Sequence, residues 1–381
     1  MHFDYVPSMP TPTRPLIVRL RNWVGDVTLG LPLLQRLADE GYALQLVGKG
    51  WARGLLAGHG WPVHTLPKTW RERAALLRRL RSEALAVDPD FAQRLNALCL
   101  PDSFSSALDF RLAGLRALGH ANEGRSPLLG RAVARQRGVH ELLVYWQLGD
   151  ALMGRDAPAP ADIGLRVSEA HRAEATALRH AHGIAPGAIL ICPFAGGTWS
   201  GQDKTWPRFA EFAQQVLPGF GRSVVVCPGP GEEAMAHSQF GSAKVLTGVG
   251  LGTYAALLQD AALMVSNDTG PGHIAAAVGT PLVSVMGPSD PALWRPWGPL
   301  VQVVQAPRGS AGAAAWPDMA QVQAAVARVL TWAQPEMPAP AQAQAQAQPV
   351  GWISHPRPGD GAPAPPGAPA LHRGGGKTGS R

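Results

Sequence analysis

The chain has 381 residues, of which 46% are hydrophobic and 16% are charged, and its formal net charge is +7. This length fits two domains of ordinary size or one large domain. No uncharged apolar run reaches about 18 residues, which excludes a membrane-spanning helix. Arginine carries most of the positive charge, with 29 arginines against 5 lysines. This bias follows either from genomic base composition or from anionic ligands, since a guanidinium pairs with phosphate or carboxylate at two points.

Three cysteines, Cys99, Cys192 and Cys227, are spread along the chain, and no two have the spacing of metal ligands. Cys192 and Cys227 lie inside apolar, strand-like runs, so we expect reduced thiols in the core of a cytoplasmic protein. Residues 1–13 contain no apolar stretch of the kind found in secretory signals. We expect this N-terminal segment to be flexible.

Short apolar runs alternate with helical patterns along most of the chain. Residues 15–20 predict a strand, residues 29–41 a helix that ends at a glycine, and residues 43–49 a second strand. The same alternation begins again near Gly187, after an Ala/Pro-rich segment at 156–162. In this second half, strands are predicted within residues 188–197, 223–231, 262–268 and 281–287, and helices within residues 206–219, 253–261, 272–279 and 319–333.

Strands that alternate with helices of about 10–15 residues are typical of βαβ units and parallel sheets, which places the chain in the α/β class. We predict two Rossmann-like domains, residues 14–165 and 166–334, with a linker near 156–170. Residues 335–381 are rich in Ala, Pro, Gln and Gly and are predicted to be a disordered tail. Ligands of such sheets bind in the crevice at the carboxyl ends of the strands.

Two segments of the first predicted domain carry charged residues that are candidates for catalysis or for binding an anionic ligand. Gly25 makes the turn after the first strand and Asp26 enters the next helix, so this carboxylate either deprotonates a hydroxyl in the crevice or caps the helix. The predicted helix at 68–81 either meets an anionic membrane or acceptor or is a solvated face; its arginines are Arg71, Arg73, Arg78, Arg79 and Arg81. The Asp-Pro-Asp at 88–90 is predicted to be a turn, not a metal site.

Two loops of the second predicted domain follow strand ends. In residues 193–207, small residues would let the backbone approach a ligand and a lysine adds a cation, although by itself this loop is better explained as a solvated surface loop. The candidate contacts in it are Gly196, Gly197, Thr198, Ser200 and Lys204. After the next strand, Glu232 and Glu233 either hold ribose hydroxyls or reflect the acidic preference of helix N-termini.

The most informative stretch is VSNDTGPGHIAAAVGTPLVSVMGPSDP, residues 265–291. Asp268 follows a buried strand, Thr269 and Gly270 form a turn, and Pro271 suits the first turn of a helix. The helix start offers unpaired N–H groups and a positive dipole end to a phosphate, and His273 lies in that first turn. Asp268 would accept hydrogen bonds from sugar hydroxyls. The alternative is that Asp268 is an N-cap and His273 a packing residue.

Together these segments resemble glycosyltransferase family 9, the ADP-heptose:lipopolysaccharide heptosyltransferases. The resemblance covers about residues 14–333, and NWVGD at 22–26 with the segment at 100–120 is most similar to the heptosyltransferase II branch. The stretch at 267–291 is the most specific. The matching segments are NWVGDVTLGLP at 22–32, DKTWP at 203–207, GPGEE at 229–233 and NDTGPGHIAAAVGTPLVSVMGPSDP at 267–291.

The resemblance implies a GT-B fold, in which two Rossmann-like domains face each other across a cleft, the first binding the acceptor and the second the donor. It implies inverting, metal-independent transfer of heptose from ADP-heptose to the lipopolysaccharide inner core (Kdo or heptose on lipid A), with no cofactor. The implied catalytic residues are Asp26, as general base, and Lys204. The implied donor contacts are Thr198, Ser200, Lys204, Glu232 or Glu233, the backbone near Val249, Asp268, Thr269, Gly270 and His273; the implied acceptor contacts are Arg71, Arg73 and Arg78.

The expected location is the cytoplasm, with association at the inner face of the inner membrane as a further expectation, and no nucleic-acid partner is expected. Two alternatives stay open from the sequence. One is a transferase of the same family that uses another nucleotide-sugar or another acceptor. The other is a non-catalytic or epimerase-like protein that binds a nucleotide-sugar.

Overall fold

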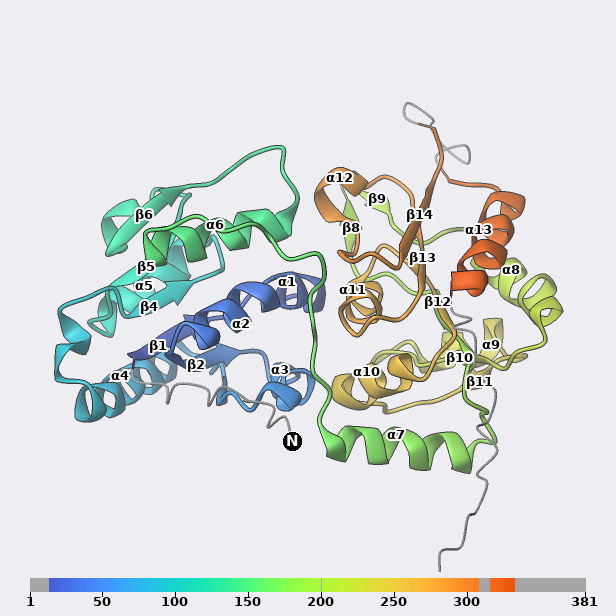
Figure 1. Cartoon of the computed structure of the whole chain (residues 1–381), viewed down its shortest axis with the longest axis horizontal. Coiled ribbons are helices and arrows are strands. Elements are labelled where there is room, and N and C mark those ends of the chain that lie inside the picture. Colours follow the sequence, from blue (N-terminus) through green and yellow to red (C-terminus); the bar gives the residue numbers. More distant parts are fainter. Residues whose placement is uncertain (1–13, 200, 308–315, 333–381) are drawn as a thin grey trace, which may run out of the picture. The chain divides into compact units, whose positions relative to one another are not determined.

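The computed structural model describes residues 14–199, 201–307 and 316–332 (Figure 1). The predicted flexible segment 1–13, the candidate contact Ser200 and the predicted tail 335–381 lie outside the described residues. Within the described parts, no helix combines the length and the apolar character needed to cross a bilayer.

The first sheet has six strands, all of them parallel to their neighbours. Its order is β3-β2-β1-β4-β5-β6, so the chain reverses direction across the sheet between β1 and β4. This reversal is a topological switch point, where a crevice opens at the carboxyl ends of the strands. The strands are β1 (Arg14–Arg19), β2 (Tyr42–Gly48), β3 (Val63–Thr65), β4 (Ala97–Cys99), β5 (Ala117–Ala121) and β6 (Arg131–Ala134).

The second sheet repeats this topology. Its order is β11-β10-β7-β12-β13-β14, again fully parallel, and its switch point lies between β7 and β12. A short antiparallel pair, β8 (Thr198–Trp199) with β9 (Gln202–Asp203), lies in the connection after β7. The strands of the sheet are β7 (Ile189–Cys192), β10 (Val224–Val226), β11 (Lys244–Val245), β12 (Leu263–Asn267), β13 (Leu282–Met286) and β14 (Val301–Gln305).

Helices cover both faces of each sheet (Figure 1). The helices of the first half are α1 (Val24–Leu29), α2 (Leu31–Asp39), α3 (Ala52–Leu55), α4 (Trp70–Val87), α5 (Phe104–Leu112) and α6 (Glu141–Met153). Those of the second half are α7 (Glu169–Ala181), α8 (Phe209–Gln215), α9 (Glu233–Gln239), α10 (Leu251–Gln259), α11 (Gly270–Ala277), α12 (Pro291–Trp294) and α13 (Met319–Trp332).

The core follows the two-residue period of the strands. In β1, Leu16 and Val18 pack into one hydrophobic cluster while Ile17 packs into another on the opposite face. In β12, Met264 and Val265 divide between two clusters in the same way. Strands that are buried on both faces read as continuous apolar runs, which is why β1, β7, β12 and β13 were predictable from the sequence.

The helix predicted within residues 29–41 is present as α2 (Leu31–Asp39), but Gly25, which was predicted to make the turn after the first strand, lies inside the helix α1. Gly30 separates α1 from α2, and a proline in the first turn of α2 lacks the N–H that a continuous helix would use. The three cysteines are free; of the two predicted core thiols Cys192 is buried and Cys227 is partly buried, and Cys99 is buried as well.

Candidate active site

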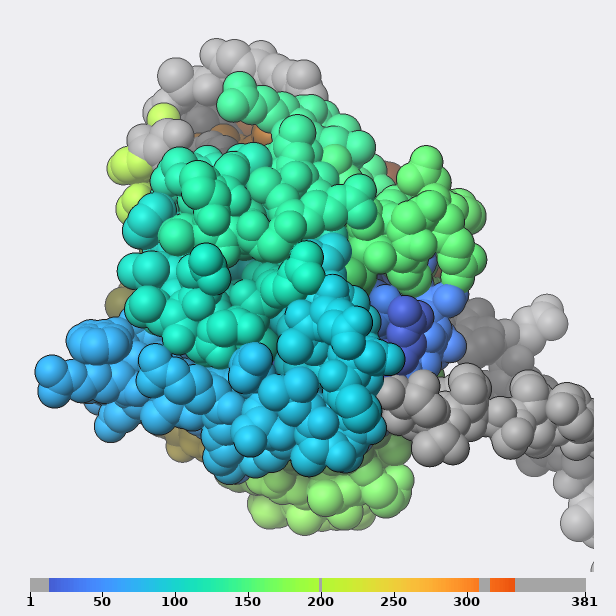
Figure 2. Space-filling view, turned by 90° about the vertical axis from the view of Figure 1, so that its left-hand side faces the viewer, coloured from blue at the N-terminus to red at the C-terminus, as the bar shows by residue number. Residues whose placement is uncertain are grey.

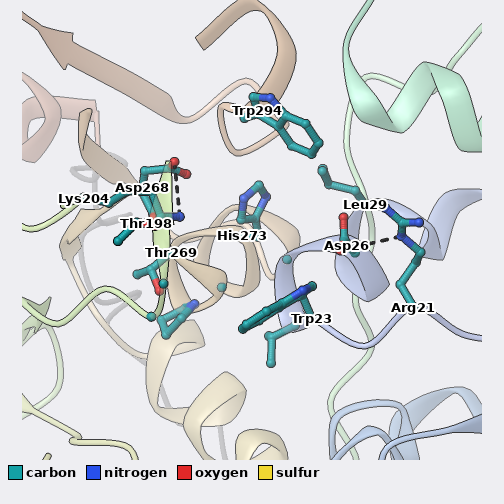
Figure 3. A pocket seen from close by; sticks show the side chains of 16 residues that line it. Arg21, Trp23, Asp26, Leu29, Thr198, Lys204, Asp268, Thr269, His273 and Trp294 are labelled. Atoms are coloured by element: carbon teal, nitrogen blue, oxygen red, sulfur yellow. Dashed lines mark hydrogen bonds and ion pairs between the residues drawn. The ribbon is translucent and has the colours of Figure 1, made fainter. Parts of the chain in front are cut away.

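A pocket of about 500 Å³ lies where the connections after β1, β7 and β12 meet (Figure 3). This volume is within the usual range for small-molecule sites. One part of its wall comes from α1 and the residues just before it, another from the loop after β7, and a third from the start of α11. Seven predicted site residues line it: Asp26, Thr198, Lys204, Asp268, Thr269, Gly270 and His273.

Asp26 is not the cap of its helix. The N-cap of α1 is Trp23, and the Asp26 carboxylate instead accepts a hydrogen bond from the Tyr145 hydroxyl at 3.0 Å. Its other oxygen lies 3.7 Å from Arg21 Nε. The Asp26 side chain is 11% exposed and lines the pocket, so this carboxylate is held in place and still open to a ligand. Such a group can accept a proton from a hydroxyl placed within hydrogen-bond reach.

The opposite side of the pocket holds Lys204 and Asp268 (Figure 3). Lys204 Nζ donates to the backbone carbonyl of Asp268 at 2.9 Å and lies 3.5 Å from its carboxylate. Asp268 also accepts a hydrogen bond from Ser289 Oγ at 2.7 Å, while the N-cap of α11 is Thr269. Asp268 is therefore not an N-cap either; it orients the ammonium group of Lys204 at the pocket wall.

One amide fixes the segment that carries Lys204. Asn267, the last residue of β12, accepts a hydrogen bond from Trp206 N at 3.0 Å and donates one to the Pro193 carbonyl at 2.6 Å. Asn267 is fully buried. It joins β12 to the loop after β7 and to the residue two positions after Lys204. The sequence reasoning passed over this residue, although its place at a strand end, next to Asp268, was the available signal.

His273 lies between the two sides of the pocket (Figure 3). Burial lowers the pKa of His273 to about 4, and the nearby charges of His140 and Lys204 act in the same direction against the opposing effect of Asp268. The imidazole is therefore neutral at neutral pH. Its Nδ1 is buried and has no hydrogen-bond partner among the described residues. His273 lines the pocket but adds no positive charge to the site.

The helices α1 and α11 approach each other through two glycines. A Cβ added to Gly25 would lie 2.9 Å from His273 Cδ2, and one added to Gly270 would lie 2.8 Å from Val24 Cβ. Contacts this short essentially do not occur for real Cβ atoms, so any other residue at these positions would force His273 or Val24 to shift. Because the two helices lie this close together, Asp26 and the start of α11 line the same pocket.

Replacing Gly270 with alanine is expected to lower the free energy of unfolding by about 1–3 kcal/mol, because the added methyl group has to push Val24 aside. Thermal or denaturant unfolding measures the change. Gly219→Ala is the matched control, since a Cβ there meets no atom within 4 Å. Equal stability of the two variants would show that α1 and α11 do not meet this closely.

Three predicted donor residues do not line the pocket. Glu232 follows β10 and accepts a hydrogen bond from Gly229 N at 2.8 Å, and Glu233 accepts one from Gly231 N at 2.8 Å. Val249 follows β11 and packs against the main hydrophobic cluster. These residues nevertheless lie at the carboxyl edge of the second sheet, as Lys204 and Asp268 do, because β10 and β11 continue that sheet outward from β7.

The predicted acceptor arginines lie on α4, and none of them is among the described residues that line the pocket. Arg73 Nε pairs with Asp109 at 2.7 Å, Arg78 donates to the Leu112 carbonyl, and Arg71 lies over the Trp70 ring. The apolar residues of α4 pack in the cluster on the face of the first sheet opposite to α2 and α6. Figure 2 shows the α4 region, in light blue, at the surface.

Several pocket residues were missed by the sequence reasoning. Arg21 stands between β1 and α1, where the strand-end rule that selected Asp26 would also have selected it. Trp23 is 68% exposed and lines the pocket, as does Trp294 at the end of α12. Tyr145, which binds Asp26, lies 119 residues further along the chain, and no local pattern connects the two.

Comparison with known proteins places this site in context. A family model described as glycosyltransferase family 9 (heptosyltransferase) matches residues 93–315. The chain is 34% identical to lipopolysaccharide heptosyltransferase 3 of Escherichia coli over 130 residues, or 32% of this chain and 36% of that protein. This alignment therefore spans about a third of that relative's length.

Two further comparisons cover more of the chain. Lipopolysaccharide heptosyltransferase 2 of E. coli K12 is 26% identical over 310 residues, 74% of this chain and 86% of that protein. The structure of E. coli ADP-heptose lipopolysaccharide heptosyltransferase II has a TM-score of 0.70 at 24% identity, covering 84% of this chain and 99% of the other. The shared fold confirms the predicted α/β class and the GT-B arrangement of two parallel sheets.

Proposed function

Because the chain belongs to glycosyltransferase family 9, the heptosyltransferases, we propose that it transfers heptose from ADP-heptose to the lipopolysaccharide inner core with inversion at the anomeric carbon. The observation that carries this proposal is the single pocket that has the Asp26 carboxylate on one side and Lys204 with the start of α11 on the other. An acceptor hydroxyl and a donor diphosphate need those two environments at the same time.

In this mechanism the donor diphosphate lies against Lys204 and the N-terminus of α11. The ammonium group and the helix dipole stabilise the negative charge that develops as ADP leaves, without a metal ion. Asp26 accepts the proton of the acceptor hydroxyl while the oxygen of that hydroxyl forms a bond to the anomeric carbon. The bond between that carbon and the diphosphate oxygen breaks on the opposite face, so the configuration inverts.

We propose that the nucleoside of the donor lies along the carboxyl edge of the second sheet. From β7 the strand order continues to β10 and β11, where Glu232 and Val249 follow the strand ends. We propose that Glu232 or Glu233 accepts hydrogen bonds from the ribose hydroxyls and that the backbone near Val249 holds the adenine. Glu232 uses one carboxylate oxygen for Gly229 N, which leaves the other for a ribose hydroxyl. Thr198, Thr269 and Asp268 then surround the sugar and diphosphate.

The arginines of α4 suit a more distant anionic ligand. Arg71 and Arg78 are exposed, whereas Arg73 is partly buried against Asp109. We propose that α4 contacts the phosphates or carboxylates of the acceptor, or the anionic inner leaflet that holds it, at a distance from the reacting hydroxyl. This location would place the protein in the cytoplasm, at the inner face of the inner membrane.

Calorimetric titration tests the donor. We expect ADP and ADP-heptose to bind at least about tenfold more tightly than UDP-sugars, a difference of about 1.4 kcal/mol. Transfer to heptose-deficient lipopolysaccharide, followed by mass spectrometry, then tests the acceptor. Tighter binding of a UDP-sugar would identify another nucleotide-sugar as the donor. Release of free epimerised sugar without an acceptor would indicate an epimerase-like activity instead.

A further inference from the structure

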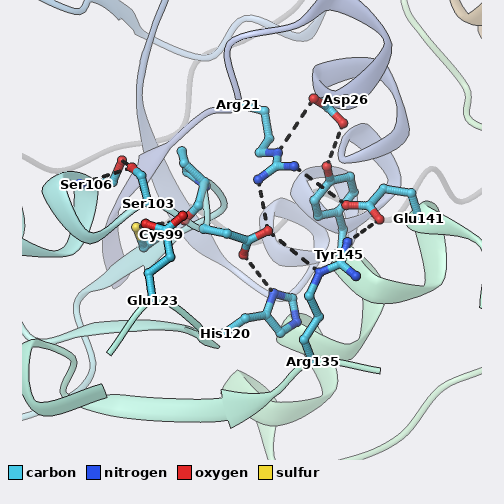
Figure 4. A network of polar contacts seen from close by, with 12 residues as sticks. Arg21, Asp26, Cys99, Ser103, Ser106, His120, Glu123, Arg135, Glu141 and Tyr145 are labelled. Atoms are coloured by element: carbon cyan, nitrogen blue, oxygen red, sulfur yellow. Dashed lines mark hydrogen bonds and ion pairs between the residues drawn. The ribbon is translucent and has the colours of Figure 1, made fainter. Parts of the chain in front are cut away.

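Behind Asp26 lies a cluster of charged side chains that the mechanism above does not use (Figure 4). Its central residue is Arg21, whose guanidinium lies among three carboxylates. Arg21 Nη1 donates to Asp102 at 3.1 Å, Nε lies 3.7 Å from Asp26, and Nη2 lies 3.9 Å from Glu141. The shortest of these contacts is to Asp102, so the cation is drawn more strongly away from Asp26 than toward it.

A second layer of cations supports Asp102 and Glu141. Arg135 pairs with Glu141 and lies 3.7 Å from Asp102, and Arg125 lies 3.5 Å from Asp102. The cluster thus contains the three guanidinium groups of Arg21, Arg125 and Arg135 and the three carboxylates of Asp26, Asp102 and Glu141. Although burial opposes it, the contact with His120 and the charge of Arg21 hold the pKa of Asp102 below its usual range. Asp102 is therefore ionised at neutral pH and keeps its hold on Arg21.

Tyr145 makes the most direct contact with Asp26. It is 1% exposed, and its hydroxyl donates to Asp26 Oδ1 at 3.0 Å. Burial and the charge of Asp26 raise the pKa of Tyr145 well above its usual value. The phenol therefore stays protonated and donates its hydrogen bond to Asp26 Oδ1, which it orients.

We propose that Tyr145 and Asp102 are positioning residues that set the basicity of Asp26 in opposite directions. Tyr145 stabilises the ionised carboxylate by its hydrogen bond. Asp102 acts through Arg21, because it holds the guanidinium at 3.7 Å from Asp26 and prevents a closer ion pair that would make Asp26 a weaker base. The assignment rests on the proposed function only in so far as Asp26 is the general base.

The other titratable and charged groups near Asp26 are neutral or already paired, so they do not decide its basicity. From α11, His273 packs against Gly25 beside Asp26, but it is neutral at neutral pH because burial lowers its pKa to about 4. On the far side of the pocket, Lys204 is paired with Asp268. On α2, Arg36 is paired with Asp150 of α6 at 2.6 Å. His140, which caps α6, has its pKa lowered by burial and is neutral as well.

The test measures the titration of Asp26 directly, by NMR of protein labelled with ¹³C at the aspartate carboxyl carbons. The Asp26 signal is assigned by its loss in Asp26→Asn. In Tyr145→Phe the titration midpoint should move to higher pH by about one unit, since a hydrogen bond to the charged form is lost. In Asp102→Asn it should move to lower pH by about half a unit or more, since Arg21 is free to approach Asp26.

Three controls complete the design. Tyr254→Phe makes the same change in a buried tyrosine whose hydroxyl donates to the Met264 sulfur, and it should leave the midpoint unchanged. Glu141→Gln, which removes another partner of Arg21, should shift the midpoint in the same direction as Asp102→Asn and serves where that variant does not fold. In the transfer assay, the acidic limb of the pH–rate profile should follow the NMR midpoints while the KM for the donor stays within twofold.

The outcomes separate this proposal from the proposed function. Shifts of Tyr145→Phe and Asp102→Asn in the same direction, or no shift in either, would overturn the positioning roles whatever the activity of the protein. Opposite shifts in a protein that transfers no heptose would support the positioning roles and overturn the proposed function instead.

Discussion

Replacing Asp26 with asparagine is expected to reduce heptose transfer by at least about 100-fold, the effect of losing a general base. The amide has nearly the same shape, and it keeps an oxygen to accept the hydrogen bond from Tyr145. It cannot take a proton from the acceptor hydroxyl. The measurements are kcat for transfer, with donor affinity by calorimetry and unfolding temperature beside it. Donor affinity should stay within about twofold, because the proposed donor contacts lie on the opposite side of the pocket.

Asp39→Asn is the matched control for this prediction. Asp39 ends the neighbouring helix α2, is exposed, and its carboxylate accepts a hydrogen bond from Gln35. The control makes the same change in charge and should leave transfer unaltered. If Asp26→Asn keeps more than about a tenth of the wild-type rate, Asp26 is not the general base, and its contacts with Tyr145 and Arg21 are structural.

Replacing Lys204 with methionine is expected to reduce kcat by about 10²–10³-fold, comparable to the loss of a charge-stabilising donor in other active sites. Methionine keeps the length and apolar character of the side chain but removes the ammonium group that contacts Asp268. Since His273 is neutral at neutral pH, it cannot replace the lost charge. ADP affinity should fall as well. Transfer assays measure kcat, and calorimetry measures the affinity for ADP.

Lys244→Met in β11 is the control for this change, because Lys244 is exposed and belongs to the same sheet. Lys204→Arg should recover part of the rate, since a guanidinium also binds phosphate but places its charge differently. Unchanged ADP affinity in Lys204→Met would mean that the diphosphate binds elsewhere in the pocket, and the donor orientation proposed here would be wrong.

Much of the fold was predictable because long apolar runs form the central strands. The residues of β1, β7, β12 and β13 are buried on both faces, so their sequences read as strands without reference to any partner. Outer strands carry less signal. The strand β11 has two residues, and β6 begins with an exposed arginine, so neither has a pattern that distinguishes it from a loop. The break between α1 and α2 depended on one glycine within an otherwise helical pattern.

The candidate site was predictable to the extent that it follows strand ends. Asp26 follows β1 at the start of α1, and Asp268 comes just after β12, so each lies at the carboxyl edge of its own parallel sheet. Asp26 is contacted by Tyr145 and by Arg21, and Arg21 is in turn held by Asp102; Tyr145 and Asp102 are distant in sequence, and only the folded chain brings them together. Glu232 was predicted by the same rule, but its carboxylate turns to its own loop and does not line the pocket.

Because glycines stand at the crossing of α1 and α11, substitutions there can change the distance between the two helices in one direction only. An added Cβ at position 25 would meet the imidazole of His273, and one at position 270 would meet the side chain of Val24, so no substitution can bring the helices nearer. Any other residue at position 25 or 270 has to push His273 or Val24 aside, which widens the space between α1 and α11. An attempt to make room for a bulkier sugar could therefore begin at this crossing, whereas a tighter site would have to be built from the pocket side chains.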